Sequence, residues 1–147
     1  MKCTREFDYA VMTMAFLARM EPGHVVVRRE IAERLELPDD FLAKILKKLN
    51  RAGLVKSFKG VRGGYTVGRA ASRISLADIV DAIDGPVSLM RGFEGRDKGS
   101  CEGFCLCDAT DAVKRVEGKL VEALEGIKLT ELVGDGCGGP VRRYRSA

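Results

Sequence analysis

Three cysteines stand close together in the second half of the chain, at Cys101, Cys105 and Cys107. Thiolates are soft ligands, so three of them within seven residues suit an iron–sulfur cluster or a zinc ion. Three thiolates leave one coordination position for a fourth ligand. That ligand is either an oxygen or nitrogen atom from elsewhere or one of the remaining cysteines, Cys3 and Cys137. The other interpretation of this trio is a set of unligated thiols.

The cysteine count also bears on the cellular compartment. Five is an odd number, and in a reducing cytosol clustered thiols are metal ligands or redox groups rather than parts of a disulfide framework. No apolar run reaches the roughly 20 residues that a membrane span needs, and residues 1–6 lack the apolar core of a signal peptide. We therefore expect a cytoplasmic protein without membrane contact, and 147 residues allow one compact domain with an accessory element.

Positive charge is concentrated in one part of the chain. The whole sequence has a formal net charge of only +4, but residues 28–69 contain eleven lysine or arginine residues against five acids, a net charge of +6. The remainder is slightly acidic. A local excess of this kind is typical of a surface that binds a polyanion.

The sequence before this basic stretch predicts an amphipathic helix over residues 5–20. Apolar residues recur there at intervals of three and four, at Tyr9, Met12, Phe16 and Met20, and Val11 and Leu17 widen this stripe. Pro22 and Gly23 end the pattern, and residues 25–27 form a short β-prone run.

Two further helices are expected within the basic stretch, over residues 29–36 and 39–52, with a tight turn between them. The third helix has an apolar face, and its cations fall mostly on the opposite side: Lys44, Lys47, Lys48 and Arg51. This is the helix-turn-helix pattern, in which the second helix of the pair enters the major groove of DNA. Lysine is a point charge, so its expected role is phosphate contact. Arg28 is a further candidate for contact with DNA.

A β-hairpin is expected directly after the third helix. Residues 54–58 and 65–67 are strand-like, and residues 59–64 between them contain three glycines, which permit a tight tip with positive φ angles. The hairpin carries Lys56, Lys59 and Arg62, and no acid occurs from residue 54 to residue 70. Two adjoining basic surfaces predict that double-stranded DNA is the partner.

The second half of the chain predicts a sensor and a dimerisation element. Residues 75–83 predict a fourth helix with Ser75 as its N-cap, and a glycine-rich loop leads from it to the cysteines. Residues 111–127 predict another helix, whose apolar stripe has no partner in the first domain, so we expect a second copy of the chain to cover it. The stripe consists of Val113, Val116, Leu120, Leu124 and Ile127.

The expected fold is therefore mostly α with a small β-hairpin wing, a winged helix-turn-helix with a long C-terminal dimerisation helix. Its parts are the DNA-binding domain over residues 1–85, the cysteine-containing sensor loop over 86–110, the dimerisation region over 111–133 and a flexible tail over 134–147.

A series of short motifs runs along residues 1–133 and ends after the cysteine cluster. They are Thr4, Tyr9-Ala10, Ile31-Ala32-Glu33-Arg34, Leu42, Ile45-Leu46, Leu49, Gly53-Leu54-Val55, Gly63-Gly64-Tyr65, Ile79-Val80, Ala82-Ile83-Asp84-Gly85 and Ile127-Lys128-Leu129. Their order resembles the bacterial winged-helix transcription regulators of the IscR and NsrR type, which include iron–sulfur-cluster and nitric-oxide sensors. The resemblance implies a homodimer that binds partly palindromic operators, with the tip of each wing near a minor groove.

The resemblance also implies a ligand set of three cysteines and one other residue, for a cluster of the 2Fe–2S or 4Fe–4S type. In NsrR-type members the other ligand is an aspartate just before the Tyr-Ala pair, which is Asp8 here, donated across the dimer. The cysteine spacing departs from the family, which commonly has five residues between neighbours. Cys101 and Cys107 match the second and third family cysteines, Gly95 stands at the position of the first, and Thr110 replaces the histidine ligand of IscR-type members.

Together these features predict a dimeric transcription regulator whose operator binding is controlled at the cysteine site, in response to redox state, nitric oxide or iron–sulfur supply. A change of ligation would reorder residues 91–107 and, through the dimer helix, alter the spacing of the two winged helices. The alternative is a metal-free winged-helix regulator that senses through thiol oxidation or a protein partner. No nucleophile elbow or phosphate-binding glycine loop occurs, so neither an enzyme nor a small-molecule substrate is expected.

Overall fold

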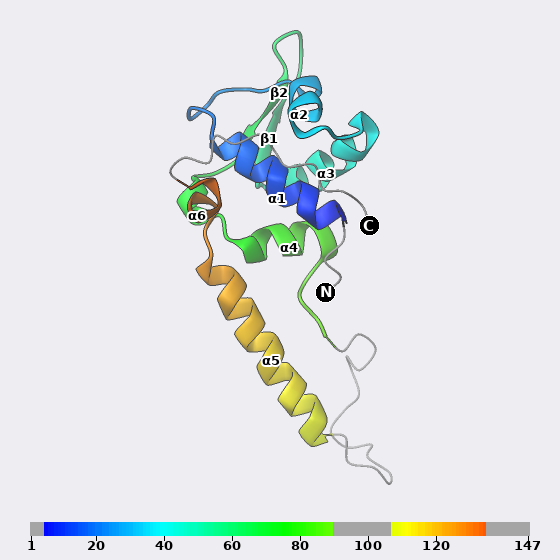
Figure 1. Ribbon diagram of the computed structural model, residues 1–147, viewed down its shortest axis with the longest axis vertical. Helices are drawn as coiled ribbons and strands as arrows, with labels where there is room; N and C mark the ends of the chain where they lie inside the picture. The colour runs from blue at the N-terminus through cyan, green and yellow to red at the C-terminus, as the bar shows by residue number, and fades with distance from the viewer. Residues whose placement is uncertain (1–4, 90–106, 135–147) are drawn as a thin grey trace.

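The computed structural model describes residues 5–89 and 107–134, and these are mostly helical with one two-stranded antiparallel sheet. Figure 1 shows helices packed together around the foot of the hairpin, with one long helix, α5, extending away from them. The elements are α1 (Arg5–Ala18), α2 (Arg28–Leu35), α3 (Asp39–Arg51), β1 (Val55–Phe58), β2 (Gly64–Val67), a 3-10 turn (Ala71–Arg73), α4 (Leu76–Asp84), α5 (Cys107–Gly126) and α6 (Leu129–Val133). The expected winged helix-turn-helix and long C-terminal helix are confirmed.

The first helix, α1, packs its predicted apolar stripe against the core, but most of its deepest side chains lie beside that stripe. The deepest are Ala10, Thr13, Met14 and Leu17, of which only Leu17 was predicted. The rest of the predicted stripe is half-buried: Tyr9, Val11, Met12, Phe16 and Met20. Because α1 contacts α3, α4, α6 and β2, neighbours cover it from several sides and the apolar periodicity does not single out one face. The Thr13 hydroxyl donates a hydrogen bond to the Tyr9 carbonyl (2.7 Å), which satisfies this buried polar group.

The helix-turn-helix pair forms nearly where the sequence predicts it. Helix α2 begins at Arg28, one residue early, and ends at Leu35. Its C-cap, Glu36, adopts a left-handed conformation (φ 52°) uncommon for a residue other than glycine. The four inward-facing residues of α3 are fully buried: Leu42, Ile45, Leu46 and Leu49. This packing fixes which side of α3 faces away from the protein.

The hairpin pairs Val55 with Val67 and Phe58 with Gly64. Positive φ was expected at several tip glycines, but among the hairpin glycines only Gly60 has it (104°). A Cβ atom on Gly64 would lie 2.4 Å from the Val26 carbonyl oxygen, because Val26 and Tyr65 exchange two backbone hydrogen bonds across this point. Close backbone approach therefore explains this glycine, and Val26 forms an isolated bridge in place of the expected β-prone run.

Helix α4 begins with Ser75 as its N-cap, as the sequence predicted, and Ser75 forms a capping box with Asp78. The Asp78 backbone N–H donates to the Ser75 hydroxyl oxygen (3.2 Å), and the Ser75 backbone N–H donates to the Asp78 carboxylate (2.8 Å). Arg69, just beyond β2, forms an ion pair with the same carboxylate (3.1 Å). Burial alone would raise the pKa of Asp78, but the bonds from Ser75 and the charge of Arg69 outweigh it and lower that pKa.

We expect Asp78→Asn to destabilise the protein at pH 7 but not at low pH. The stabilisation from a carboxylate with a lowered pKa is complete above its unfolded-state pKa of about 3.9 and is lost as the pH falls through the folded-state value. Urea unfolding of both proteins between pH 7 and pH 3 measures this difference, and Ser75→Ala should cost about 1 kcal/mol at pH 7. A difference that stayed constant down to pH 3 would contradict the role of the Asp78 charge.

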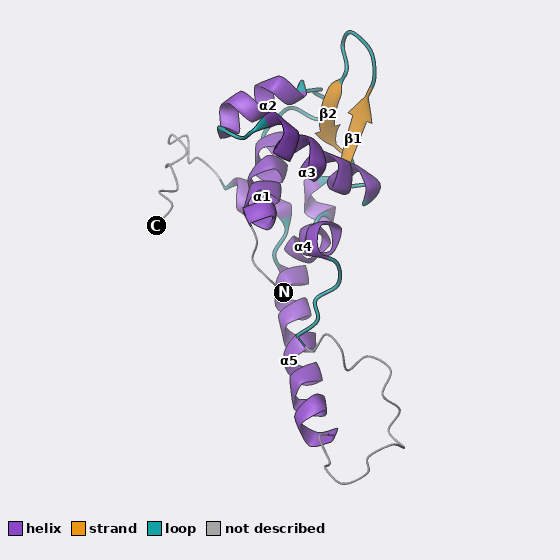
Figure 2. Cartoon of the chain, turned by 90° about the vertical axis from the view of Figure 1, so that its right-hand side faces the viewer, coloured by secondary structure: helices purple, strands orange, loops and turns teal. Residues whose placement is uncertain are grey.

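The C-terminal segment returns to the first domain, which the sequence did not predict. Ser75 and Lys128 form a β-bridge in which the Leu76 N–H donates to the Ile127 carbonyl (2.9 Å) and the Leu129 N–H donates to the Ile74 carbonyl (2.8 Å). Leu129 is fully buried in the core. Helix α6 then packs on α1, so the C-terminal end of α5 is fixed to the domain while its other end projects outward (Figure 2). Within residues 5–89 and 107–134, no helix is long and apolar enough to cross a membrane.

Candidate nucleic-acid interface and cysteine site

The outward side of α3 carries a line of cations. Lys44, Lys47 and Arg51 are exposed and lie opposite the four buried leucine and isoleucine side chains. The structure records no ion pair between any of these three and another described residue. Helix α3 therefore presents three cations to solvent along one side.

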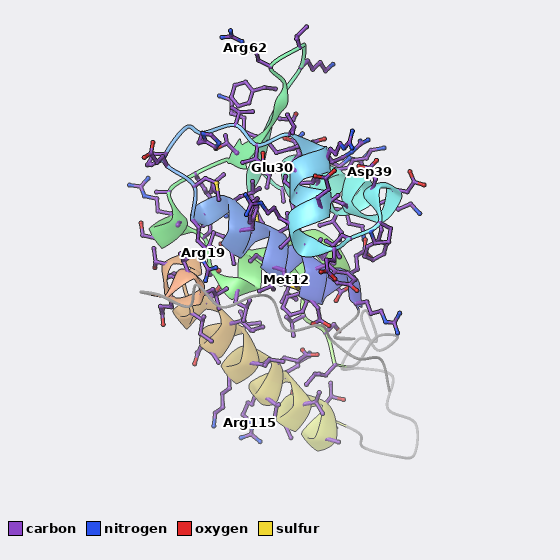
Figure 3. All side chains as sticks on the ribbon, turned by 45° about the horizontal axis from the view of Figure 1, so that its top comes forward. Met12, Arg19, Glu30, Asp39, Arg62 and Arg115 are labelled. Carbon is purple, nitrogen blue, oxygen red and sulfur yellow. The ribbon has the colours of Figure 1, made fainter. Side chains whose placement is uncertain are left out.

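The hairpin adds a second group of cations next to α3. Lys56, Lys59 and Arg62 are exposed, and the Lys56 ammonium lies over the Phe58 ring, 5.3 Å from its centroid. Figure 3 places Arg62 at the tip, where the apolar side chain of Val61 is also fully exposed. The hairpin projects from the end of the molecule opposite to α5 (Figure 1), so the two groups of cations belong to the end remote from α5.

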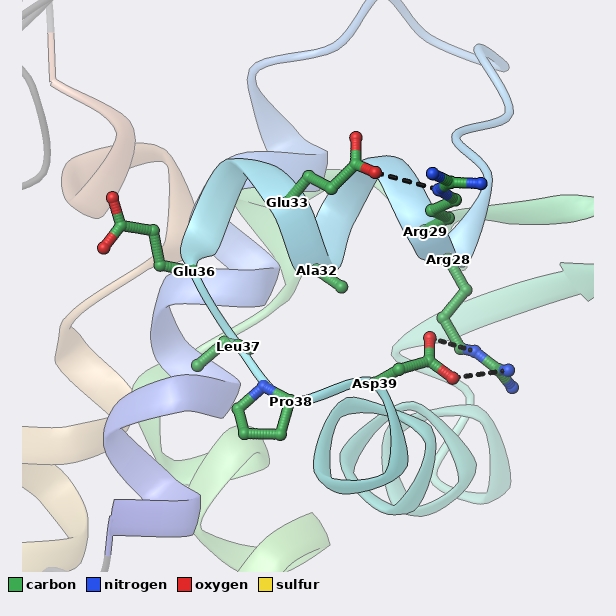
Figure 4. Close-up of a pocket in the computed structure, with 8 residues that line it drawn as sticks. All are labelled: Arg28, Arg29, Ala32, Glu33, Glu36, Leu37, Pro38 and Asp39. Atoms are coloured by element: carbon green, nitrogen blue, oxygen red, sulfur yellow. Dashed lines mark hydrogen bonds and ion pairs between the residues drawn. The ribbon is translucent and has the colours of Figure 1, made fainter.

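Arg28 has a different environment from the exposed cations. Its guanidinium donates two hydrogen bonds to the Asp39 carboxylate (2.9 and 2.8 Å), and this pairing raises the pKa of Arg28. The pair joins the first residue of α2 to the first residue of α3 along the rim of an open hollow between the two helices (Figure 4). Arg29, also on this rim, pairs with Glu33 (2.8 Å). Arg28 is therefore paired with an acid in the free protein, whereas Lys44, Lys47 and Arg51 have no such partner among the described residues.

Lys48 also turns away from the line of exposed cations. Its ammonium forms an ion pair with Glu6 of α1 (2.8 Å) and donates to the carbonyl of Ile83 in α4 (3.1 Å). The sequence grouped Lys48 with the exposed cations of this helix, but the two neighbouring helices supply an acid and a carbonyl within its reach. The structure therefore brings Lys44, Lys47, Arg51 and the hairpin cations to one end of the molecule and leaves Lys48 in an internal contact.

The cysteine site lies largely outside the described residues. Cys101 and Cys105 fall in the undescribed stretch 90–106, and Cys3 and Cys137 fall in the undescribed terminal stretches. Cys107 is the first residue of α5, so this helix begins four residues before its expected start. In the parts of the chain that the structure describes, no three His, Cys, Asp or Glu residues form a group that could hold a metal ion.

Asp8 is exposed on α1. Helix α1 belongs to the packed part of the molecule, whereas the end of α5 that carries Cys107 is the end farthest from it (Figure 1). The 20 residues of α5 extend about 30 Å. Asp8 and the start of α5, where Cys107 lies, are therefore separated within one chain.

A series of contacts links the fixed end of α5 to the hairpin. The bridge between Ser75 and Lys128 attaches the end of α5 to the start of α4, and Asp78 in the first turn of α4 holds Arg69 beyond the end of β2. The sequence predicted Ser75 as an N-cap, but no local pattern predicted that Lys128 would pair with Ser75 or that Arg69 would contact Asp78.

The chain matches one family model over almost its whole length. The Rrf2 model, described as an iron-dependent transcriptional regulator, matches residues 3–135. The chain is 31% identical over 135 residues to the HTH-type transcriptional regulator IscR of Vibrio vulnificus, an alignment that covers 92% of this chain and 79% of that protein.

Solved structures agree with this match. The structure of CymR, titled the global cysteine regulator of B. subtilis, has a TM-score of 0.71 and 25% identity, with 90% of this chain and 96% of that chain covered. The structure titled T. potens IscR has a TM-score of 0.66 and 26% identity, with 90% and 86% covered.

Proposed function

The chain belongs to the Rrf2 family of transcriptional regulators, which bind DNA, and from this premise we propose that it is a homodimeric repressor controlled by an iron–sulfur cluster. It is a regulator and not an enzyme. In the proposed complex, α3 of each protomer enters a major groove, and each wing approaches the adjacent minor groove. The observation that carries this proposal is the pair of cation groups, on α3 and on the hairpin, at the end of the molecule remote from α5.

The proposed contacts follow from the chemistry of each side chain. Lys44, Lys47 and Arg51 lie along α3 and would contact phosphates and base edges. Lys56 would contact the DNA backbone, and Lys59 and Arg62 at the hairpin tip would approach the minor groove, whose negative potential attracts such cations. Arg28 would contact a phosphate only by leaving Asp39. Lys48 is excluded from this list, because Glu6 and the Ile83 carbonyl already bind its ammonium.

We expect Lys59→Ala combined with Arg62→Ala to weaken binding and to make it less sensitive to salt. Each phosphate contact releases a counterion, and the variant loses two contacts in each protomer and four in the dimer, so the slope of log affinity against log salt should become shallower by about four units. The measurement is fluorescence anisotropy at several salt concentrations, with a duplex that the wild-type protein selects from a random library.

The matched control removes the same charge from the opposite end of the molecule. Lys114 and Arg115 are exposed on α5, and Figure 3 shows Arg115 far from Arg62. Lys114→Ala with Arg115→Ala should leave the salt slope unchanged. Equal slopes for the wild type and the hairpin variant would overturn the assignment of the wing to DNA contact.

For the sensing site, we propose that Cys101, Cys105 and Cys107 hold the cluster and that Asp8 of the other protomer supplies the fourth ligand. The donor set fits, because three thiolates on a short segment suit iron–sulfur chemistry and the family description is iron-dependent. Donation across the dimer is supported by the separation of α1 from the start of α5 within one chain. Such a cluster, when bound, supplies reactivity toward oxidants and nitric oxide.

The chain's own residues would transmit a change at this site. Cys107 begins α5, and the other end of α5 is attached to Ser75 through the bridge with Lys128. Tilting α5 would therefore move α4, and through Asp78 and Arg69 the base of the hairpin. A dimer binds both half-sites only at one separation, about 34 Å or a multiple of it, so a small tilt is enough to change operator affinity.

A second candidate is a metal-free regulator that responds to the state of thiols. The similarity to CymR, the global cysteine regulator of B. subtilis, favours this alternative, as does the altered spacing of the cysteine trio. In this case Cys101, Cys105 and Cys107 would be oxidised or would face a protein partner, with the same transmission through α5.

A further inference from the structure

Asp40, the second residue of α3, lies on the same side of the helix as the exposed cations. At 100° per residue, positions 40, 44, 47 and 51 fall within about 40° of one line along the helix, directly opposite the buried leucine and isoleucine residues. Asp40 is exposed, as are Lys44, Lys47 and Arg51. One carboxylate therefore stands one helical turn before a line of cations, at the N-terminal end of the helix that the proposed function inserts into the major groove.

The neighbouring acid has a structural role that Asp40 does not share. Both carboxylate oxygens of Asp39 accept hydrogen bonds from Arg28. No hydrogen bond or ion pair connects the Asp40 carboxylate to another residue that the structure describes, although its charge adds to the field that raises the pKa of Arg28. The burial of the leucine and isoleucine side chains of α3 sets the side of the helix on which Asp40 lies.

The chemistry of DNA limits what a carboxylate in this position can contact. Phosphates repel it, so with α3 in the groove its favourable contacts are with base edges. An ionised carboxylate only accepts hydrogen bonds, and the amino donors of the major groove are cytosine N4 and adenine N6. Adenine also presents the acceptor N7 beside its amino group, which repels a carboxylate, so cytosine is the base that fits.

We propose that Asp40 determines sequence specificity by accepting a hydrogen bond from the N4 amino group of a cytosine in each half-site. This inference rests on the proposed insertion of α3 into the major groove. At the same time Asp40 weakens binding to other sequences, because an unpaired carboxylate in the groove is repelled by the phosphates.

The test is selection of binding sites from a random duplex library by the wild type, Asp40→Asn and Asp40→Ala. The wild type should select a cytosine at one position of each half-site. Asparagine pairs with adenine through N6 and N7, so Asp40→Asn should shift the preference at that position to adenine, and Asp40→Ala should abolish it. On individual duplexes, Asp40→Ala should remove a preference for cytosine of about five- to a hundredfold.

A purely structural role for Asp40 predicts a different result. If the carboxylate only stabilised the start of α3, both variants would lower thermal stability slightly and change affinity equally for all sequences. Identical selected motifs for the wild type and the two variants would therefore overturn the proposal. Asp81→Asn, which removes an exposed carboxylate from α4, is the charge-matched control and should keep the wild-type motif. A wild type that binds no duplex at all would instead contradict the proposed function itself.

Discussion

Protein purified without oxygen should contain iron and acid-labile sulfide and absorb visible light, and Cys101→Ser, Cys105→Ser or Cys107→Ser should each remove most of this signal. A serine hydroxyl is a much poorer ligand for iron than a thiolate. Serine at position 107 also suits the start of a helix, so Cys107→Ser should leave α5 intact, which far-UV circular dichroism checks. Destroying the cluster in the wild type with oxygen or nitric oxide should change operator affinity, measured on one duplex before and after treatment.

Any other outcome of this experiment would support one of the two alternative interpretations of the cysteine site. A colourless protein with stoichiometric zinc would replace the cluster by a zinc site, and a metal-free protein would leave the thiol-sensing alternative. Cys137→Ser tests the fourth ligand, since it should have no effect if Asp8 supplies that ligand. Loss of the cluster in Cys137→Ser, with Asp8→Ala unaffected, would contradict the assignment of Asp8.

A mixed dimer tests whether Asp8 is donated by the other protomer. A dimer of one Asp8→Ala chain and one Cys107→Ser chain contains a single complete site if the aspartate comes from the partner, and none if it comes from the same chain. Each parental dimer lacks every complete site in both arrangements. Two affinity tags allow the mixed dimer to be isolated, and we expect half the iron content of the wild type. Iron content no higher than in the parental dimers would contradict donation across the dimer.

The parts of the fold that depend on neighbouring residues could be predicted from the sequence. The N-cap at Ser75, the buried side of α3 and the hairpin follow from spacings of two to four residues, which carry the signal for caps, faces and turns. For α1 the same reasoning identified Leu17 but not the other three deeply buried positions. Its apolar residues occur almost all around the helix, and only the positions of α3, α4, α6 and β2 decide which of them is buried most deeply.

Contacts between distant segments could not be predicted in this way. Lys48 was assigned to the DNA-facing side, but Glu6 lies 42 positions earlier in the chain and reaches it only once α1 packs on α3. The pairing of Arg28 with Asp39 likewise depends on the angle of the turn between α2 and α3. The return of residues 128–133 to the core was missed, because a continuous apolar stripe up to Ile127 favoured one uninterrupted dimer helix. The cysteine trio remains a prediction from spacing and resemblance.

A single carboxylate introduced into the apolar stripe of α5 should have a large effect on dimer formation and on operator affinity. Val116 is 54% exposed and Ile127 37% exposed, and Val113 and Leu120 are partly exposed, whereas Leu124 is covered by its own chain, so most of the apolar stripe is at least partly open in one protomer. We expect Val116→Asp to prevent dimer formation, because a carboxylate buried against an apolar helix has no partner. A monomer holds only one half-site, and losing the second contact should lower operator affinity about a hundredfold or more. Analytical ultracentrifugation at micromolar concentration and anisotropy measure the two effects.

Gly118→Asp provides the matched control on the same helix. Position 118 lies on the side of α5 opposite to Val116, and a Cβ atom there would meet nothing within 4 Å. Aspartate has a higher helix propensity than glycine, so this variant should remain folded and dimeric, with operator affinity close to that of the wild type. If Val116→Asp stayed dimeric, the stripe on α5 would not be the interface. If both variants became monomeric, added charge and not the apolar face would be the cause. Only a monomer for Val116→Asp beside a dimer for Gly118→Asp supports α5 as the contact that sets the spacing of the two winged helices.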